Sequence, residues 1–249
     1  METIKIYMEY RYLLFLHFLF GSVQLFAQTE FTVSLYDSQR KRIIPIAVYE
    51  PKHINKKTSV VIFNHGYGQN ATDSYLTYSC LTKPLAEKGY YVISIQHELS
   101  DDAPLPMTGE FMKTRISNWE RGVENIVFTI KQFKRLQPKL NWNNLSIIGH
   151  SNGGDMAMLL ATRHPQIARK VISLDHRRMI MPRCDTPKIY TLRGSDYDAD
   201  KDVIPTIEEQ QKHCITVIKL DDIKHSDMDN KGTREQHNTI LHYLYKFLK

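Results

Sequence analysis

One serine in this 249-residue sequence stands in a setting that could make it a nucleophile. Gly149, Ser151 and Gly153 form a G-x-S-x-G motif, with an apolar stretch before it and a helical pattern after it as far as Pro165. A serine at the tip of such a strand–turn–helix has a strained backbone and an exposed hydroxyl. The two glycines let strand and helix approach closely. The pattern therefore predicts that Ser151 is a nucleophile rather than part of an ordinary glycine-rich turn.

A nucleophilic serine needs a base, and the base needs a carboxylate that fixes its tautomer and stabilises its cation. After a G-x-S-x-G turn the order along the chain is serine, acid, histidine, and the histidine lies between the last strand and the last helix. Residues 221–228 fill that position, and His225 is the one histidine among them. The order and placement predict His225 as the base.

Three aspartates could orient His225. Asp175 ends the strand after the nucleophile helix, whereas Asp196 and Asp200 follow the next strand. Catalytic groups of open α/β sheets lie at the carboxyl ends of the strands, so each is a candidate. The residues alone leave this choice open.

An acyl-transfer reaction also needs two N–H donors for the oxyanion. One is expected from Asn152, which follows the nucleophile, and the other from Tyr67, which follows the apolar run 60–63. Gly66 and Gly68 would let that backbone turn inward.

His97 lies just past another apolar run, 91–95. At the rim of the pocket it could have either of two roles, contact with substrate or orientation of His65. The alternative is a structural histidine with no part in the chemistry.

Strands and helices must alternate to position these residues. The apolar patterns predict a hairpin, further strands, and helices that end at proline, at glycine or at the chain end. Strands are expected at 31–49 (the hairpin), 60–63, 91–95, 145–148, 170–174, 188–192 and 215–220, and helices at 75–88, 119–137, 152–164, 205–213 and 233–248. This alternation predicts an α/β fold, one domain with a mostly parallel sheet and helices on both faces. Residues 175–187 are too few to form a lid domain. The segment 98–118 is therefore expected to be the only long segment that could cover the site.

The overall composition is that of a globular protein, with 42% hydrophobic and 24% charged residues. The formal net charge is +6, but the basic residues are scattered, which argues against a nucleic-acid partner. No Cys/His spacing resembles a metal site, and no phosphate loop is present.

The N-terminal residues have the layout of a secretory signal peptide. Lys5 and Arg11 precede an apolar run at 12–20, and Ala27 is the best cleavage position. We therefore expect a signal peptide at 1–27, a mature domain at 28–249, a secreted or periplasmic location and no stable membrane span after cleavage; the alternative is an uncleaved anchor. An exported chain could pair two of its cysteines, Cys80, Cys184 and Cys214, and leave one free.

These motifs together resemble the α/β-hydrolase superfamily over nearly all of the mature chain. Residues 63–68, 95–98, 149–154 and 174–182 are similar to segments of the platelet-activating-factor acetylhydrolase-like and dienelactone-hydrolase-like serine esterases. The resemblance implies hydrolysis of a small-molecule or lipid carboxylic ester through an acyl-enzyme, without metal or cofactor. It also favours Asp175 as the acid, with Asp196 and then Asp200 as the alternatives. The alternative hypotheses are an acyltransferase or a peptidase with the same triad, and a catalytically silent binding protein on the same fold.

Overall fold

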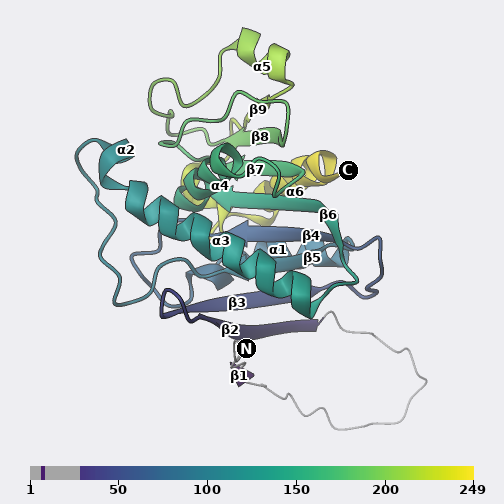
Figure 1. Cartoon of the computed structure of the whole chain (residues 1–249). Coiled ribbons are helices and arrows are strands. Elements are labelled where there is room, and N and C mark those ends of the chain that lie inside the picture. The colour runs from purple at the N-terminus through teal and green to yellow at the C-terminus, as the bar shows by residue number, and fades with distance from the viewer. Residues whose placement is uncertain (1–6, 9–28) are drawn as a thin grey trace.

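A nine-stranded sheet runs through the described part of the chain, which is residues 7–8 and 29–249 of this computed structural model (Figure 1). The strand order is β1-β2-β3-β5-β4-β6-β7-β8-β9. Strands β1, β2 and β3 are paired antiparallel, and β3 is antiparallel to β5. All pairs from β5 through β4, β6, β7, β8 and β9 are parallel. The strands are β1 (Tyr7–Met8), β2 (Thr29–Asp37), β3 (Arg42–Glu50), β4 (Ser59–Asn64), β5 (Tyr91–Ile95), β6 (Asn141–His150), β7 (Lys170–Leu174), β8 (Lys188–Arg193) and β9 (Thr216–Lys219).

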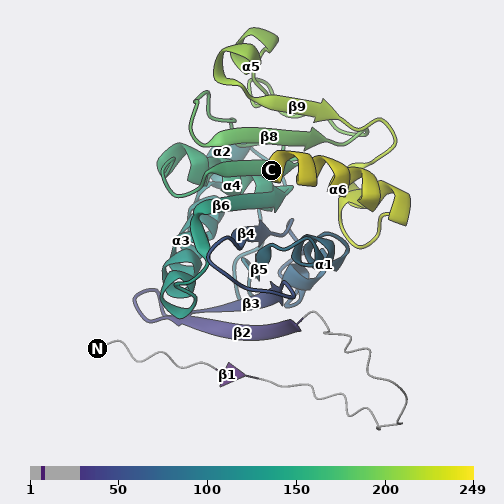
Figure 2. The ribbon, with the colours of Figure 1, turned by 90° about the vertical axis from the view of Figure 1, so that its right-hand side faces the viewer.

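The helices cover the two faces of this sheet as separate layers (Figure 2). On one face α3 and α4 pack over a core that includes Trp119, Ile126 and Met156. On the other face α1 and α6 pack over a core that includes Leu81 and Leu244. The helices are α1 (Ser79–Glu87), α2 (Phe111–Thr114), α3 (Ile116–Leu136), α4 (Asn152–Arg163), α5 (Ile207–His213) and α6 (Arg234–Leu248), with single 3₁₀ turns η1 (Ser74–Leu76) and η2 (His225–Met228).

The register of the parallel strands brings their carboxyl ends to one edge. Asn64 of β4 is paired with Gly149 of β6, and Leu174 of β7 lies between His150 and Leu192. The residues that follow these strands are therefore neighbours in space, although they are far apart in the sequence. This edge is where the predicted nucleophile, acid and oxyanion loop all emerge.

The fold confirms the predicted α/β architecture, a mostly parallel sheet with helices on both faces, and the described residues include no separate lid domain. Some element boundaries were wrong. The helix expected at 75–88 is split into η1 and α1 and continues through Pro84, and α3 begins at Ile116 rather than at Trp119. Within the segment expected to be irregular, the four residues of α2 are helical.

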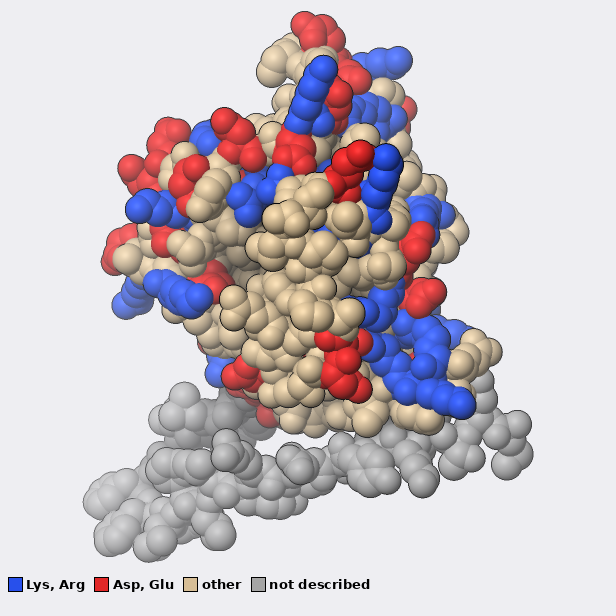
Figure 3. Space-filling view, turned by 90° about the vertical axis from the view of Figure 1, so that its left-hand side faces the viewer, with Lys and Arg blue, Asp and Glu red and all other residues tan. Residues whose placement is uncertain are grey.

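The predicted signal peptide lies outside the described residues, except for the two residues of β1. No helix in the described ranges has the length and apolar character needed to cross a bilayer. Figure 3 shows charges of both signs scattered around a largely uncharged area on the side where α2 lies.

Candidate active site

Ser151 occupies the turn between β6 and α4 in a backbone conformation that side chains rarely adopt. Its φ is 52° and its ψ is −121°, in a sparsely populated region of backbone space. The turn is tight because a Cβ on Gly149 would come within 2.2 Å of the Gly153 carbonyl oxygen, and one on Gly153 within 2.4 Å of the Asn64 carbonyl oxygen. Ser151 itself stays partly exposed at the edge of the sheet.

His225 links this serine to an acid. Its Nε2 lies 3.0 Å from Ser151 Oγ, and its Nδ1 lies 2.6 Å from Asp175 Oδ2. The histidine begins η2, after the last strand, as its place in the sequence predicts. Both separations are hydrogen-bond distances, so the three side chains form one continuous chain from carboxylate to hydroxyl.

Asp175 is fully buried and each of its oxygens is occupied. Oδ2 accepts from His225. Oδ1 accepts from the Gly194 backbone N–H at 2.9 Å and faces Arg193 Nη2 at 2.8 Å. Burial alone would raise the pKa of Asp175, but the His225 hydrogen bond, the Arg193 charge and the Gly194 N–H together lower that pKa to about 2. The carboxylate is therefore ionised at neutral pH and can hold the imidazole N–H.

The two alternative acids make other contacts and do not reach the His225 ring. Asp196 Oδ1 accepts from the backbone N–H of His225 at 2.7 Å, so it supports the main chain of that residue and not its ring. Asp200 forms an ion pair with Arg178 on the surface. Asp175 reaches the ring because it leaves β7 directly, with its backbone N–H bonded to the Leu192 carbonyl of the neighbouring strand.

The two segments that carry the expected oxyanion donors both come close to Ser151. Asn152 is the first residue of α4, where the backbone N–H has no acceptor within the helix. A Cβ on Gly66 would lie 3.2 Å from Ser151 Cβ, so the loop that carries Tyr67 passes close to the serine. The Tyr67 hydroxyl accepts from the Leu105 N–H at 3.1 Å, which ties this loop to the segment 98–118.

His65 sets the orientation of the Gly66–Tyr67 peptide. Its Nε2 accepts from the His97 N–H at 3.0 Å, so its proton is on Nδ1, which donates to the Gly66 carbonyl at 2.6 Å. In a trans peptide the carbonyl and the N–H point in opposite directions. The Tyr67 N–H is therefore turned away from His65.

His97 lies in the interior, which contradicts contact with substrate, one of the roles named for it, and agrees with the structural alternative. The residue is 1% exposed and its Nε2 lies 2.9 Å from Asn64 Oδ1 in the interior. Its side chain cannot touch a substrate because it is enclosed. The orientation of His65 comes instead from the backbone N–H of His97.

The side chain of Asn152 is fixed by a buried polar cluster. Trp119 Nε1 donates to its Oδ1 at 2.8 Å. Its Nδ2 donates to Asn118 Oδ1 at 2.9 Å and to Glu98 Oε1 at 3.1 Å. All four residues are nearly inaccessible to solvent. Hydrogen bonds to α3 and to the segment after β5 thus fix the start of α4, and with it the position of the Asn152 N–H.

A second series of hydrogen bonds connects the loop at Gly66 to the main chain of His225. The Gly66 N–H donates to the Tyr78 hydroxyl at 2.9 Å, which lies 2.7 Å from His150 Nδ1. His150 Nε2 lies 3.1 Å from the His225 carbonyl and donates to it, so Nδ1 accepts from Tyr78. Burial, followed by the nearby His225, lowers the pKa of His150 to about 3, so the imidazole is neutral at ordinary pH. The donor and acceptor roles in this series of hydrogen bonds therefore stay the same at ordinary pH.

Several of these supporting residues were not identified from the sequence. Arg193 and Gly194 follow a predicted strand and share its edge with Asp175, so their position was a usable signal. Tyr78 and Glu98 gave no signal for these contacts, because their partners are distant in the sequence.

Two further expectations concern cysteines and metals. Cys80, Cys184 and Cys214 are all free, so no disulfide forms between any two of them. They lie in α1, in the segment between β7 and β8, and at the end of α5. Among the residues that the structure describes, no group of three or more His, Cys, Asp or Glu side chains could hold a metal ion.

Known proteins share both the sequence pattern and this fold. The BD-FAE family profile matches residues 46–179, which contain the Ser151 turn and Asp175. A serine hydrolase-like protein of Dictyostelium discoideum is 28% identical over 137 residues, or 53% of this chain and 32% of that protein. The chain thus spans about a third of the length of this curated relative.

Two solved structures illustrate the fold. One is an α/β serine hydrolase without a lid from Xanthomonas campestris, with a TM-score of 0.62 and 12% identity, covering 89% of this chain and 96% of that one. The other is a thermophilic esterase from Thermogutta terrifontis, with a TM-score of 0.63 and 11% identity, covering 89% and 91%. At these identities the likeness concerns the fold.

Proposed function

Because the chain belongs to the BD-FAE family, a family of α/β-hydrolases, we propose that it is a serine hydrolase that cleaves carboxylic esters. The observation that carries the proposal is the continuous link from Asp175 to Ser151, with 2.6 Å and 3.0 Å between the successive polar atoms. Nucleophile, base and acid within hydrogen-bond reach are what acyl transfer to serine requires.

In the proposed mechanism His225 takes the proton from Ser151 Oγ as the oxygen attacks the ester carbonyl carbon. The resulting imidazolium is stabilised by the ionised carboxylate of Asp175. His225 then gives the proton to the departing alkoxide, which leaves as an alcohol, and the acyl group stays on Ser151. Water, deprotonated by the same imidazole, attacks the acyl-enzyme and releases the carboxylic acid.

The tetrahedral intermediate carries a negative oxygen that needs donors in place before the reaction. We assign this role to the backbone N–H groups of Tyr67 and Asn152. The buried contacts of His65 and of the Asn152 side chain support the assignment, because both restrict how far these peptides can turn. The proposed chemistry uses these protein groups alone.

We also propose that the mature protein begins near Gln28 and acts outside the cytoplasm, from the layout of residues 1–27. N-terminal sequencing of the protein from its producing cell tests this. An intact Met1 in the membrane fraction would instead mean an uncleaved anchor.

The test of the function is active-site labelling followed by an ester panel. A fluorophosphonate probe should label the purified mature protein, and Ser151→Ala should abolish labelling. Hydrolysis of p-nitrophenyl esters of increasing acyl length then defines the acyl preference. Absence of labelling would favour a binding protein on a hydrolase fold. Labelling without ester hydrolysis would favour a peptidase or an acyltransferase.

A further inference from the structure

Arg177 lies near His225, the proposed base, and the aromatic ring of Tyr197 contacts both residues. It is the second residue after Asp175, half-buried, and its guanidinium carbon lies 4.4 Å from the centroid of the Tyr197 ring. The Tyr197 ring is 51% exposed and stands edge-on to the His225 imidazole, with 6.1 Å between the centroids. Arg177, Tyr197 and His225 therefore form a continuous row from the surface to the reacting serine.

Among the residues that the structure describes, no carboxylate pairs with the charge of Arg177. Its neighbour Arg178 is paired with Asp200 and Arg193 with Asp175, whereas no carboxylate of residues 29–249 lies within 4.0 Å of the Arg177 guanidinium. Of the carboxylates nearest the triad, Asp196 accepts from the His225 backbone. A guanidinium stacked on an aromatic face keeps its N–H edge available for a planar acceptor such as a carboxylate.

The side of the site on which Arg177 lies decides which part of a substrate it would meet. During acylation the imidazole that deprotonated Ser151 gives its proton to the departing alkoxide. The alcohol part of an ester must therefore pass next to the His225 ring, and Tyr197 and Arg177 lie next in the row. From this geometry, and resting on the proposed function, we propose that Arg177 and Tyr197 select esters whose alcohol part carries an oxyanion, a carboxylate in the first instance.

A matched pair of esters tests the proposal on the full mature protein. The anionic substrate is 4-acetoxybenzoate and the neutral one is its methyl ester; both transfer the same acetyl group to Ser151 and release a phenol. The quantity to compare is the ratio of kcat/KM for the anionic ester to that for the neutral ester. Comparing this ratio between variants removes the intrinsic difference in reactivity of the two esters.

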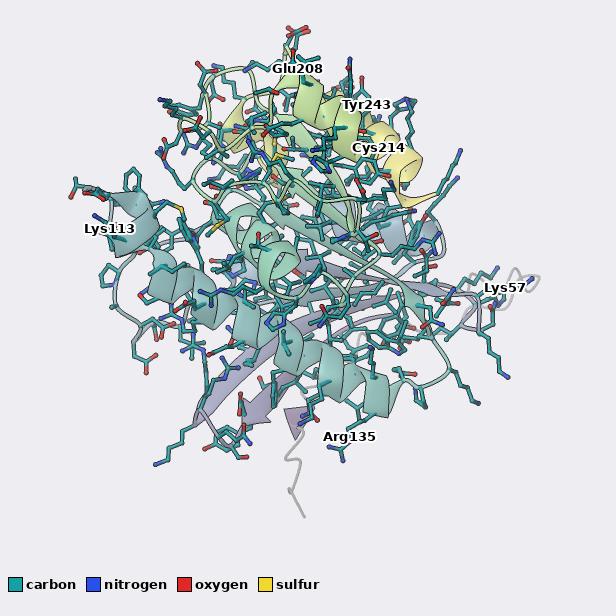
Figure 4. All side chains as sticks on the ribbon, turned by 45° about the horizontal axis from the view of Figure 1, so that its top comes forward. Lys57, Lys113, Arg135, Glu208, Cys214 and Tyr243 are labelled. Carbon is teal, nitrogen blue, oxygen red and sulfur yellow. The ribbon has the colours of Figure 1, made fainter. Side chains whose placement is uncertain are left out.

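Arg177→Gln should lower the ratio about fivefold, mostly through KM for the anionic ester, as expected for a partly exposed ion pair. Arg177→Lys keeps the charge without the planar fork and should give an intermediate ratio. The wild-type preference should weaken as salt is raised from 0.01 M to about 1 M. Arg135→Gln removes the same charge at the carboxyl end of α3, far from α2 (Figure 4), and should leave the ratio unchanged.

Two outcomes would overturn the proposal while leaving ester hydrolysis intact. One is an unchanged ratio in Arg177→Gln, and the other is an equal loss in Arg135→Gln, which would indicate a general effect of net charge. A protein that hydrolyses neither ester, and that the fluorophosphonate probe does not label, would overturn the proposed function and the selectivity with it.

Discussion

Asp175 and His225 are 50 residues apart in the sequence, yet Oδ2 of one lies 2.6 Å from Nδ1 of the other. Gly194 makes this approach possible, because a Cβ there would lie 3.0 Å from the His225 backbone nitrogen and 3.1 Å from Asp175 Oδ2. Asp175 also has a φ of 52°, which turns its side chain sharply as β7 ends. Asp175, His225 and Gly194 therefore fit closely together.

Replacing Asp175 by Asn should leave Ser151 reactive but slow. The amide presents a donor to His225 and favours the wrong tautomer, so we expect kcat to fall by about 10⁴-fold. Steady-state kinetics on one p-nitrophenyl ester would measure this. Asp196→Asn and Asp200→Asn are the controls and should stay within about tenfold of wild type, because neither carboxylate contacts the ring. Near-normal kcat in Asp175→Asn would remove this residue from the mechanism.

Ser151→Ala should lower kcat by about 10³-fold or more, and His225→Ala by a similar factor. The double variant should lose little more than either single variant, because nucleophile and base act as one unit. Circular dichroism and thermal unfolding would establish that each variant is folded. Comparable activity in folded Ser151→Ala would be incompatible with an acyl-enzyme on this residue.

Tyr78→Phe should impair catalysis although the tyrosine is not expected to touch substrate. The change removes the hydroxyl that bridges the Gly66 N–H and His150 Nδ1. The proposed oxyanion loop and the proposed base then lose the hydrogen bonds that connect them. We expect kcat to fall by about tenfold with a smaller change in KM, since the loss falls on transition-state positioning.

Tyr245→Phe is the matched control for this effect. It also removes a hydroxyl hydrogen bond, from Tyr245 to the Pro84 carbonyl between α6 and α1, but one with no link to the site. Equal kcat losses in the two variants would mean that Tyr78 acts only through general stability.

Asp155 should make the stability of the protein depend on pH. Its carboxylate is 2% exposed and accepts from the N–H groups of Arg178 at 2.9 Å and Met179 at 2.8 Å. Burial outweighs these bonds and the charges of Arg115 and Arg178, and raises the pKa of Asp155 from 3.8 to about 6. The folded state therefore binds this proton more tightly than the unfolded state. The stabilising contribution is full below about pH 4 and is lost as the pH rises through about 6.

Asp155→Asn keeps an acceptor oxygen and removes the titration. Relative to its own value at pH 4, the variant should retain more free energy of unfolding at pH 8 than wild type does, by up to ~3 kcal/mol. Urea unfolding at a series of pH values measures the difference. Parallel curves for the two proteins across this range would show that Asp155 does not titrate as described.

The alternation of apolar runs, helical patterns and glycine turns was enough to predict the fold class. Buried parallel strands are nearly continuous apolar runs, so β4, β5 and β7 are visible in the sequence. Boundaries were less secure at the starts of α1 and α3, which the apolar pattern alone did not locate. The catalytic roles of Ser151, His225 and Asp175 stay predictions until the variants above are measured.

By itself the sequence determined the positions at which catalytic groups could occur, namely the turn at Ser151 and the ends of the strands. It could not decide among Asp175, Asp196 and Asp200, because all three follow strands that end at the same edge. Only the tertiary structure decided which carboxylate meets the His225 ring and which meets its backbone N–H. It also revealed the enclosed position of His97 and the links through Tyr78 and Glu98. Such contacts depend on distances between chain segments that only the strand register and the packing of helices fix, and no local pattern of residues records them.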